Sequence, residues 1–290
     1  MLKSDVSNGY LKISELFFFS IQGEGMWVGK PSIFVRMFGC NFTCSGFSMP
    51  RGEKSKERLD IDPSKYNEYN QLPLVNTGCD SYASWDPRFK HLSKEYTLDE
   101  LVEKIRDLLP HGKFGSEVDL ILTGGEPLLG WQKQYIDLFD KINKAGLDLK
   151  NVTFETNGTQ KLIQPLYDFI LANDGPRYPN IKFTFSVSSK LSSSGENWKK
   201  AIKPEVLDQY CSTYAHVYFK WVIDDEKDVY DINRAIIEYD QDVPVFVMAA
   251  GGTTEHYFKN TKKVAQIAME NGWRYSPRMQ VDLWKNAWAT

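Results

Sequence analysis

Segments of helical periodicity alternate with short β-rich runs along the last two thirds of the chain. The helical segments repeat their apolar residues every three or four positions, and turn signals separate them from the β-rich runs. The predicted strands cover 118–123, 152–156, 182–188, 216–223 and 243–249, and the predicted helices cover 98–108, 131–145, 161–171, 229–239 and 261–271. This alternation predicts an α/β fold with a parallel sheet, either open or curled into a partial barrel.

The first third of the chain adds two apolar runs. The run at 16–19 leads into two glycines that flank Glu24 and favour a tight turn. The run at 32–38 is almost continuously apolar, as expected of a strand covered on both faces, except for Arg36. A buried arginine needs an anionic partner, and the sequence leaves a structural ion pair and a substrate carboxylate equally open.

A long polar segment follows from residue 45 to about 77. Its charges nearly cancel, and its pattern favours a solvated loop that contains at most a short helix. Loops of this length in compact domains are often lids or binding loops. We find no internal repeat and no shift in composition that marks a boundary, so we expect residues 1–290 to form a single domain.

Composition and charge exclude several classes of partner. The 290 residues are 42% hydrophobic and 25% charged, which suffices for a full core. The formal net charge of -3 gives no long-range attraction to nucleic acid or to an anionic membrane, so we expect neither partner. The first residues do not form a signal-peptide pattern, and we predict a cytoplasmic protein with reduced thiols.

Four unusual segments lie where predicted strands end, and the carboxyl ends of parallel strands are where ligands gather. They cover 39–44, 124–127, 155–158 and 186–190. Cys40 and Cys44 lie in the first of them, and thiolates of this kind select zinc or iron–sulfur clusters. Two ligands complete neither site, and the other cysteines of the chain are Cys79 and Cys211.

Together these motifs resemble the 7-carboxy-7-deazaguanine synthase family of the radical S-adenosylmethionine enzymes. The resemblance rests on Ile21-Gln-Gly-Glu-Gly25, Phe34-Val-Arg36, Gly39-Cys-Asn41, Cys40-x3-Cys44, Cys79-Asp-Ser81 with Trp85, Leu122-Thr-Gly-Gly-Glu-Pro127, Glu155-Thr-Asn-Gly-Thr159 and Val187-Ser-Ser-Lys190. It runs in order from about residue 16 to 190 and continues weakly to the end. It implies an α/β fold, specifically a partial, open (β/α)6-type TIM barrel.

One departure from the family pattern is large. Such enzymes usually carry a third cysteine three positions after the second, and here that position is Phe47, which cannot be a ligand. The family's Cys-Asp-Thr element reappears at Cys79-Asp80-Ser81, 32 positions later, as if a segment at about 45–78 had been inserted into the cluster loop. The resemblance then implies that Cys40, Cys44 and Cys79 bind a [4Fe-4S] cluster. No motif surrounds Cys211, and we expect it to be a buried structural cysteine.

The resemblance also implies roles for individual residues. It assigns S-adenosylmethionine binding to Gly124, Gly125, Glu126, Ser188, Ser189 and Lys190, where Ser189 replaces a proline of the relatives. It assigns substrate binding to Ile21, Gln22, Gly23, Glu24, Arg36 and Thr123, and Mg2+ binding to Ser81, which replaces a threonine. The C-terminal segment aligns only loosely with the relatives, so no contact is carried over to it.

The activity that the resemblance implies is the conversion of 6-carboxy-5,6,7,8-tetrahydropterin to 7-carboxy-7-deazaguanine and ammonia, an Mg2+-assisted lyase reaction that leads to queuosine and other deazapurines. It further implies a flavodoxin-like or other electron donor and a homodimer. The long insertion and the altered C-terminal segment motivate one alternative, a radical enzyme acting on a different pterin or purine. A second alternative is a non-catalytic zinc module that uses all four cysteines, which their unmatched spacing disfavours.

Overall fold

The computed structural model describes residues 9–172 and 181–288, and in this part of the chain one nine-stranded sheet organises the molecule. The strand order is β3-β1-β2-β4-β5-β6-β7-β8-β9. The strands are β1 (Tyr10–Ile21), β2 (Pro31–Met37), β3 (Lys94–Thr97), β4 (Asp119–Gly124), β5 (Asn151–Thr156), β6 (Lys182–Val187), β7 (His216–Ile223), β8 (Val245–Ala249) and β9 (Arg274–Tyr275).

The helices fill connections between these strands, except for α8, which follows β9. They are α1 (Leu98–Leu108), α2 (Gln132–Lys144), α3 (Gln164–Leu171), α4 (Trp198–Ala201), α5 (Pro204–Cys211), α6 (Lys227–Tyr239), α7 (Thr254–Glu270) and α8 (Met279–Trp284). No helix in the described ranges is long and apolar enough to cross a membrane.

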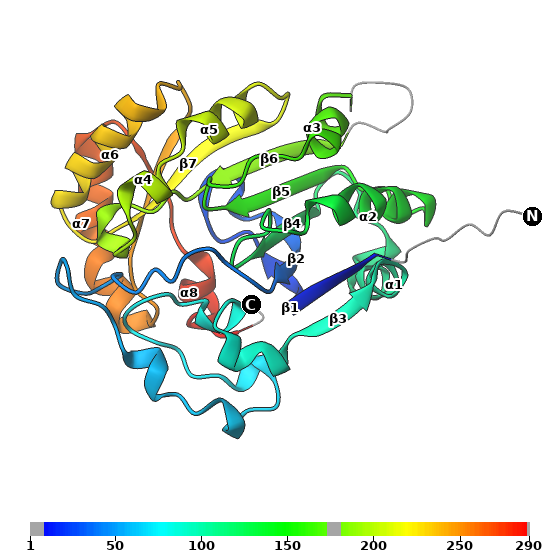
Figure 1. The fold of residues 1–290 in the computed structure, drawn as a ribbon, viewed down its shortest axis with the longest axis horizontal. Helices are drawn as coiled ribbons and strands as arrows, with labels where there is room; N and C mark the ends of the chain where they lie inside the picture. Colours follow the sequence, from blue (N-terminus) through cyan, green and yellow to red (C-terminus); the bar gives the residue numbers. More distant parts are fainter. Residues whose placement is uncertain (1–8, 173–180, 289–290) are drawn as a thin grey trace, which may run out of the picture.

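The sheet is mostly parallel and does not close. Strands β2, β4, β5, β6, β7, β8 and β9 are parallel to their neighbours in this series, whereas β1 pairs antiparallel with both β2 and β3. Figure 1 shows the longer helices along the outer side of the curved sheet, with α8 and the cyan segment after β2 across its open side. The predicted partial, open barrel is confirmed, and it directs the carboxyl ends of six consecutive parallel strands toward one region.

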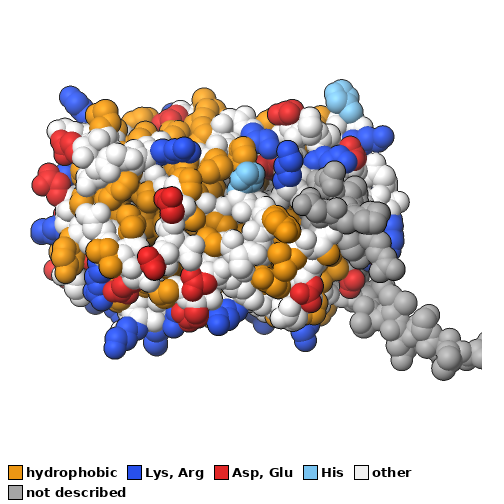
Figure 2. All heavy atoms as spheres, turned by 90° about the horizontal axis from the view of Figure 1, so that it is seen from above, with side chains coloured by type: hydrophobic (Ala, Val, Ile, Leu, Met, Phe, Trp, Pro, Cys, Tyr) orange, Lys and Arg blue, Asp and Glu red, His pale blue; other side chains and the backbone are white. Residues whose placement is uncertain are grey.

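The core lies between the sheet and its helices because both present apolar faces there. Helix α1 begins at a capping box in which Thr97 Oγ1 accepts from the backbone N–H of Glu100, and it buries Leu98, Leu101 and Ile105. Strands β4 and β5 contribute fully buried residues such as Leu122 and Phe154 to the same core. The outer surface is mixed, and the face in Figure 2 scatters acidic and basic side chains among apolar ones.

Several boundaries differ from the sequence-based predictions. Helix α7 begins at Thr254 rather than 261, and α3 begins at Gln164 rather than 161 because Pro165 takes its first turn. The run at 16–19 is part of the longer strand β1, from which Glu15, Phe17 and Ile21 line the cavity described below. The sequence pattern does not predict the short elements α4, α5, α8, β3 and β9, since each has too few residues for a clear period.

The segment from 45 to 77 is more ordered than the predicted solvated loop. It contains three 3-10 turns, at Glu57–Asp60, Pro63–Lys65 and Tyr69–Gln71. Tyr69, Leu72 and Val75 are buried with residues that follow Cys79, including Tyr82 and Phe89, in a second hydrophobic cluster separate from the main core. Scattered apolar side chains in a polar segment thus form a small core of their own.

Candidate active site

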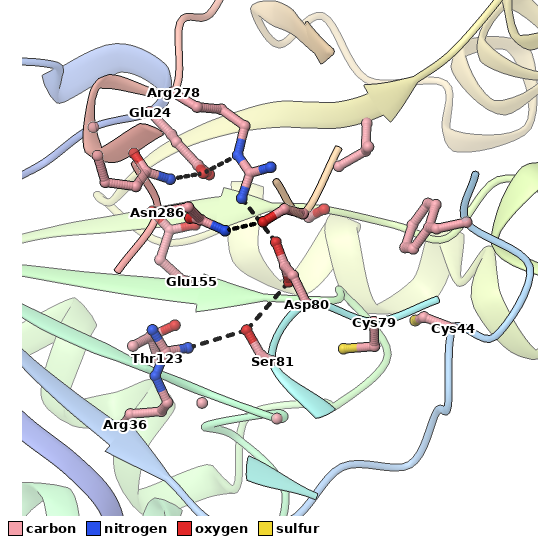
Figure 3. A pocket seen from close by; sticks show the side chains of 18 of the residues that line it. Glu24, Arg36, Cys44, Cys79, Asp80, Ser81, Thr123, Glu155, Arg278 and Asn286 are labelled. Atoms are coloured by element: carbon pink, nitrogen blue, oxygen red, sulfur yellow. Dashed lines mark hydrogen bonds and ion pairs between the residues drawn. The ribbon is translucent and has the colours of Figure 1, made fainter. Parts of the chain in front are cut away.

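A cavity of about 280 Å³ lies beyond the carboxyl ends of the parallel strands. Its walls come from β1, β2, β4, β5, β7 and β8, from the residues that follow β6, and from the segments 40–81 and 278–288. Figure 3 shows the sulfur atoms of Cys44 and Cys79 on one side of it and the charged groups of Glu24 and Arg278 on the other. The cavity therefore has a thiol end and a charged end.

Three cysteines form the thiol end. Cys40 and Cys44 follow strand β2, Cys79 follows the segment 45–78, and all three line the cavity and pack with Phe42. Burial raises the pKa of the Cys40 thiol to about 12 and that of Cys79 to about 11, and it also raises the pKa of Cys44 well above its ordinary value. The thiols are protonated at neutral pH, so a metal that binds them must displace protons.

Hydrogen bonds hold the cysteine loop in place. The backbone N–H groups of Thr43 and Cys44 both donate to Glu196 Oε1 over 2.8 Å, and Cys44 adopts a left-handed backbone with φ of 47°. At the start of the loop, Gly39 N–H donates to the carbonyl of Ser84 over 2.8 Å. The second contact joins the first two cysteines to the turn that follows Cys79, which explains how ligands far apart in sequence meet.

The insertion returns to the cysteine loop through backbone contacts. The N–H of Gly78 donates to the carbonyl of Phe47 over 2.8 Å, and that of Ser55 donates to Ser45 over 2.7 Å. Phe47, at the usual position of the third ligand, lines the cavity. The Lys190 ammonium nitrogen lies 5.9 Å from the centroid of its ring. The segment leaves and re-enters the thiol end at neighbouring points, so the insertion leaves Cys79 near Cys40 and Cys44.

Gly124 and Gly125 bring strand β4 against the cysteine loop. A Cβ atom on Gly125 would lie 2.2 Å from the carbonyl oxygen of Gly39 and 2.7 Å from Cys40 Cβ, and Gly124 has a φ of 142°. Both glycines line the cavity. Only glycine permits this approach, because any side chain at 125 would push the loop that carries Cys40 away.

Glu126 differs from the sequence-based expectation that its carboxylate faces a ligand. The residue is fully buried behind the cavity wall, where Oε1 accepts from Thr156 Oγ1 and Leu128 N–H, and Oε2 accepts from Asn157 N–H over 2.7 Å. These donors fasten the end of β5 to the end of β4. Asn157 in turn lines the cavity and donates to Asn41 over 2.9 Å.

The segment 188–190 is only partly exposed to the cavity. Ser188 and Lys190 line it, and Lys190 Nζ donates to Ser188 Oγ over 3.2 Å. Ser189 is turned away, and its hydroxyl lies 2.7 Å from the Tyr239 hydroxyl on α6. The side chain that replaces the relatives' proline thus anchors the segment to a helix, which supplies an alternative restraint on its backbone.

The charged end contains a lysine that the sequence reasoning missed. Lys220, at the centre of β7, is 4% exposed, and its Nζ lies 2.8 Å from Glu24 Oε2 and 2.6 Å from Glu155 Oε2. Gln22 also donates to Glu155 over 3.0 Å. The only signal in the sequence was a lysine inside an otherwise apolar strand, and such a residue requires buried anions.

Arg278 is the second missed residue, and it comes from the C-terminal segment. It is 6% exposed, and its guanidinium contacts Glu24 over 3.2 Å and Asp80 over 2.7 Å. Gln280 donates to Glu24 over 2.6 Å. Burial would raise the pKa of Glu24, but Lys220 and Arg278 outweigh it and lower that pKa to about 2. Glu24 is therefore held as a carboxylate.

Arg36 forms a structural ion pair, one of the two alternatives that the sequence left undecided for its anionic partner. Its Nε donates to Glu15 Oε2 over 2.7 Å, and its Nη1 donates to Ser81 Oγ over 3.3 Å. Burial opposes its charge, but Glu15 outweighs burial and raises the pKa of Arg36. Arg36, Ser81 and Thr123 all line the cavity, as Figure 3 shows, so the ion pair does not remove Arg36 from it.

The predicted site residues gather almost completely at this one cavity. The lining includes all of Ile21, Gln22, Gly23, Glu24, Arg36, Thr123, Gly124, Gly125, Ser188, Lys190, Cys40, Cys44, Cys79 and Ser81. Cys211 lies elsewhere, at the end of α5. Among the described residues, no three His, Cys, Asp or Glu side chains lie close enough to hold a single metal ion. A cluster makes a different demand, because each thiolate binds a separate iron.

The sequence of this chain is similar to those of known proteins along most of its length. No family model matches the chain. The chain is 29% identical to the 7-carboxy-7-deazaguanine synthase of Halobacterium salinarum over 287 residues, which cover 96% of this chain and 91% of the relative. It is 25% identical to the synthase of the same name from Pyrobaculum aerophilum, with 96% of each chain covered. The chain resembles the 7-carboxy-7-deazaguanine synthases along nearly its whole length.

The fold agrees with that resemblance. The crystal structure of QueE from Escherichia coli superimposes on this chain with a TM-score of 0.52, at 18% identity and with 92% of each chain covered. This similarity supports the open α/β barrel, and the sequence comparisons carry the resemblance itself. The resemblance predicted from the ordered motifs is confirmed.

Proposed function

We propose that this protein is a radical S-adenosylmethionine synthase that converts 6-carboxy-5,6,7,8-tetrahydropterin to 7-carboxy-7-deazaguanine and ammonia. Substrate and product differ by one ammonia, so the conversion needs no net oxidant. The observation that carries the proposal is the meeting of Cys79 with Cys40 and Cys44 at one cavity, beside Gly124 and Gly125, in a chain similar to these synthases over 96% of its length.

The thiol end fits an iron–sulfur cluster. Cys40, Cys44 and Cys79 supply three soft ligands on fixed loops, and three thiolates leave one position of a four-iron cluster open. We propose that this position takes the methionine end of S-adenosylmethionine, and the two together would supply the one-electron chemistry that starts the reaction. Lys190 lies near all three thiols and favours their ionised form.

We assign S-adenosylmethionine binding to the strand ends beside the cluster. Gly124 and Gly125 present backbone with no side chain in the way, and Ser188 and Lys190 offer a hydroxyl and a cation. Because Glu126 and Ser189 lie behind the wall, we assign them a supporting role, in which Glu126 orients Asn157 and Ser189 ties its segment to Tyr239.

We assign the pterin to the charged end. The N–H groups of a pterin ring suit acceptors such as Glu24 and the backbone at Ile21, Gln22 and Gly23, while Lys220 and Arg278 keep that carboxylate ionised. A substrate carboxylate suits the guanidinium of Arg36, which can form parallel hydrogen bonds, with Thr123 beside it. We place Mg2+ at Ser81, where Asp80 supplies a second hard oxygen 3.3 Å away.

Anaerobic reconstitution tests this proposal. Protein loaded with iron and sulfide, then given reductant, S-adenosylmethionine, Mg2+ and the tetrahydropterin, should release 7-carboxy-7-deazaguanine and ammonia in equal amounts. Mass spectrometry and an ammonia assay measure both. A protein that holds its cluster but makes no deazaguanine would contradict the substrate assignment, whereas zinc in place of iron and sulfide would contradict the enzyme class.

A different pterin or purine is the second candidate substrate, and one observation favours it. Leu74 and Asn76 of the insertion and Arg278 of the C-terminal segment line the cavity, so its walls include parts that align loosely or not at all with the relatives' motifs. A panel of pterins and purines, each assayed with the loaded enzyme, separates the two candidates. Turnover of another panel member at a higher kcat/KM would favour the second.

A further inference from the structure

One buried donor at the thiol end has no role in the reaction as described above. The Trp85 side chain lines the cavity with Cys79, and its Nε1 atom is shielded from solvent and has no hydrogen-bond partner among the described residues. An indole N–H is only a donor, and leaving it unpaired in a buried place destabilises the protein. An acceptor that arrives with a bound group would remove that cost.

The chain places this indole next to the third cysteine. A 3-10 turn at Tyr82–Ser84 folds the backbone between Cys79 and Trp85, so that the N–H of Trp85 donates to the Tyr82 carbonyl. Trp85 and Cys79 line the same cavity, together with Cys40 and Cys44. A bound cluster would bring sulfur to this cavity, and sulfur accepts hydrogen bonds from N–H groups.

The insertion holds the indole in this position. The Arg58 guanidinium lies 4.7 Å from the ring centroid of Trp85, and it is itself paired with Asp86, which Arg88 also contacts. A cation over an indole is attracted to its π face, and it draws electron density from the ring. It thus fixes the ring and makes its N–H a stronger donor.

Resting on the proposed function, we propose that Trp85 is a positioning residue for the cluster: its Nε1–H donates to sulfur at Cys79 when the cluster is bound, and Arg58 of the insertion orients it. Hydrogen bonds to cluster sulfur stabilise the more negative, reduced state and raise the reduction potential. The insertion would then set how readily the cluster accepts its electron, in addition to enlarging the loop.

Potentiometric titration of the reconstituted enzyme, followed by electron paramagnetic resonance, tests the inference. Trp85→Phe keeps a ring under Arg58 but removes the donor, so its midpoint potential should be more negative than that of the wild type. Arg58→Met should shift the potential in the same direction by less. Trp273→Phe, a tryptophan packed against the main core, is the matched control and should leave the potential unchanged.

Iron and sulfide contents are measured first, so that a failure of the proposed function can be distinguished from a failure of the role proposed for Trp85. Equal potentials in loaded wild type and loaded Trp85→Phe would overturn this inference and leave the proposed function standing. A wild type that binds no cluster would overturn both. If Trp85→Phe does not load, resonance Raman of the wild type decides, since an N–H···S bond shifts iron–sulfur stretching bands on exchange into D2O, and unshifted bands overturn the inference.

Discussion

At the scale of single residues, the four cysteines separate by place rather than by chemistry. Burial raises the pKa of Cys211 to about 11, much like that of Cys79, yet Cys211 lies at the end of α5 and Cys79 lines the cavity. A thiol becomes a cluster ligand only where other thiols converge with it. Position in the fold therefore decides which cysteines can act.

Cys79→Ala should abolish stable cluster assembly, because it leaves two thiolates for a cluster that needs at least three protein ligands in our proposal. Cys211→Ala should load as well as the wild type, since it removes a thiol away from the cavity. Iron and sulfide per chain and the visible absorption of reconstituted protein measure this. Full loading of the Cys79 variant would contradict the displaced-ligand assignment.

Glu24 illustrates how buried charge links the site to stability. Its carboxylate is ionised in the folded state, with a pKa lowered from 4.5 to about 2, because Lys220 and Arg278 outweigh burial. A group with a lowered folded pKa stabilises the fold above its unfolded pKa, and this contribution disappears as the pH falls through the folded value. The affected window runs from pH 4.5 down to about 2.

The wild type should therefore lose on the order of 3 kcal/mol of stability across this window through Glu24 alone. Glu24→Gln should lack that part of the pH dependence, while Glu155 still pairs with Lys220. Urea unfolding midpoints of both proteins, taken at several pH values from 6 to 3, provide the test. Parallel curves for the two proteins would show that Glu24 is not held ionised.

At the scale of elements, the insertion is anchored to helix α6, which lies far away in sequence. Arg51 contacts Asp228 over 3.0 Å and Asp231 over 3.2 Å on α6, and both carboxylates are almost fully buried. Within the insertion, Glu57 accepts from the N–H groups of Asn76 and Thr77. These contacts explain how a polar sequence keeps one conformation and returns the chain to Cys79.

Arg51→Met should destabilise the protein by about 1–3 kcal/mol, because it leaves two buried carboxylates without their cation. The control is Arg234→Met, which breaks an exposed pair with Glu238 on the same helix and should change stability by about 0.5 kcal/mol or less. Urea midpoints compare the variants, and limited proteolysis should show faster cleavage within 45–77 only for Arg51→Met. Similar losses in both variants would contradict the anchoring role.

At the scale of the whole molecule, the end of the chain closes the site. Trp288 Nε1 donates to the Leu72 carbonyl over 2.7 Å, and its ring meets Tyr69 edge to face at 4.9 Å. Trp288 and Arg278 also line the cavity, so the C-terminal segment joins the insertion to the charged end. The open side of the barrel is thereby covered by two segments that depend on each other.

Trp288→Ala should cost about 2–3 kcal/mol, since it removes a half-buried ring from the second hydrophobic cluster. Hydrogen exchange should become faster at 58–92 and stay unchanged in the central strands β5 and β6. Leu283→Ala is the control, because Leu283 is exposed on α8. Uniformly faster exchange along the chain would indicate that Trp288 supports the main core instead.

The sequence by itself determined the α/β alternation and the parallel strands, because helical and strand periods are local signals. Its resemblance to the synthases named a part of the cavity lining, including the three cysteines, Gly124 and Gly125. It identified Cys79 by motif, against the usual spacing. Only the tertiary structure decided that Lys220 and Arg278 surround Glu24, that Glu126 and Ser189 lie behind the wall, and that Trp85 lines the cavity with the three cysteines. Those outcomes depend on which charges and donors meet across the fold, and residues up to 254 positions apart in the chain carry no local pattern that pairs them.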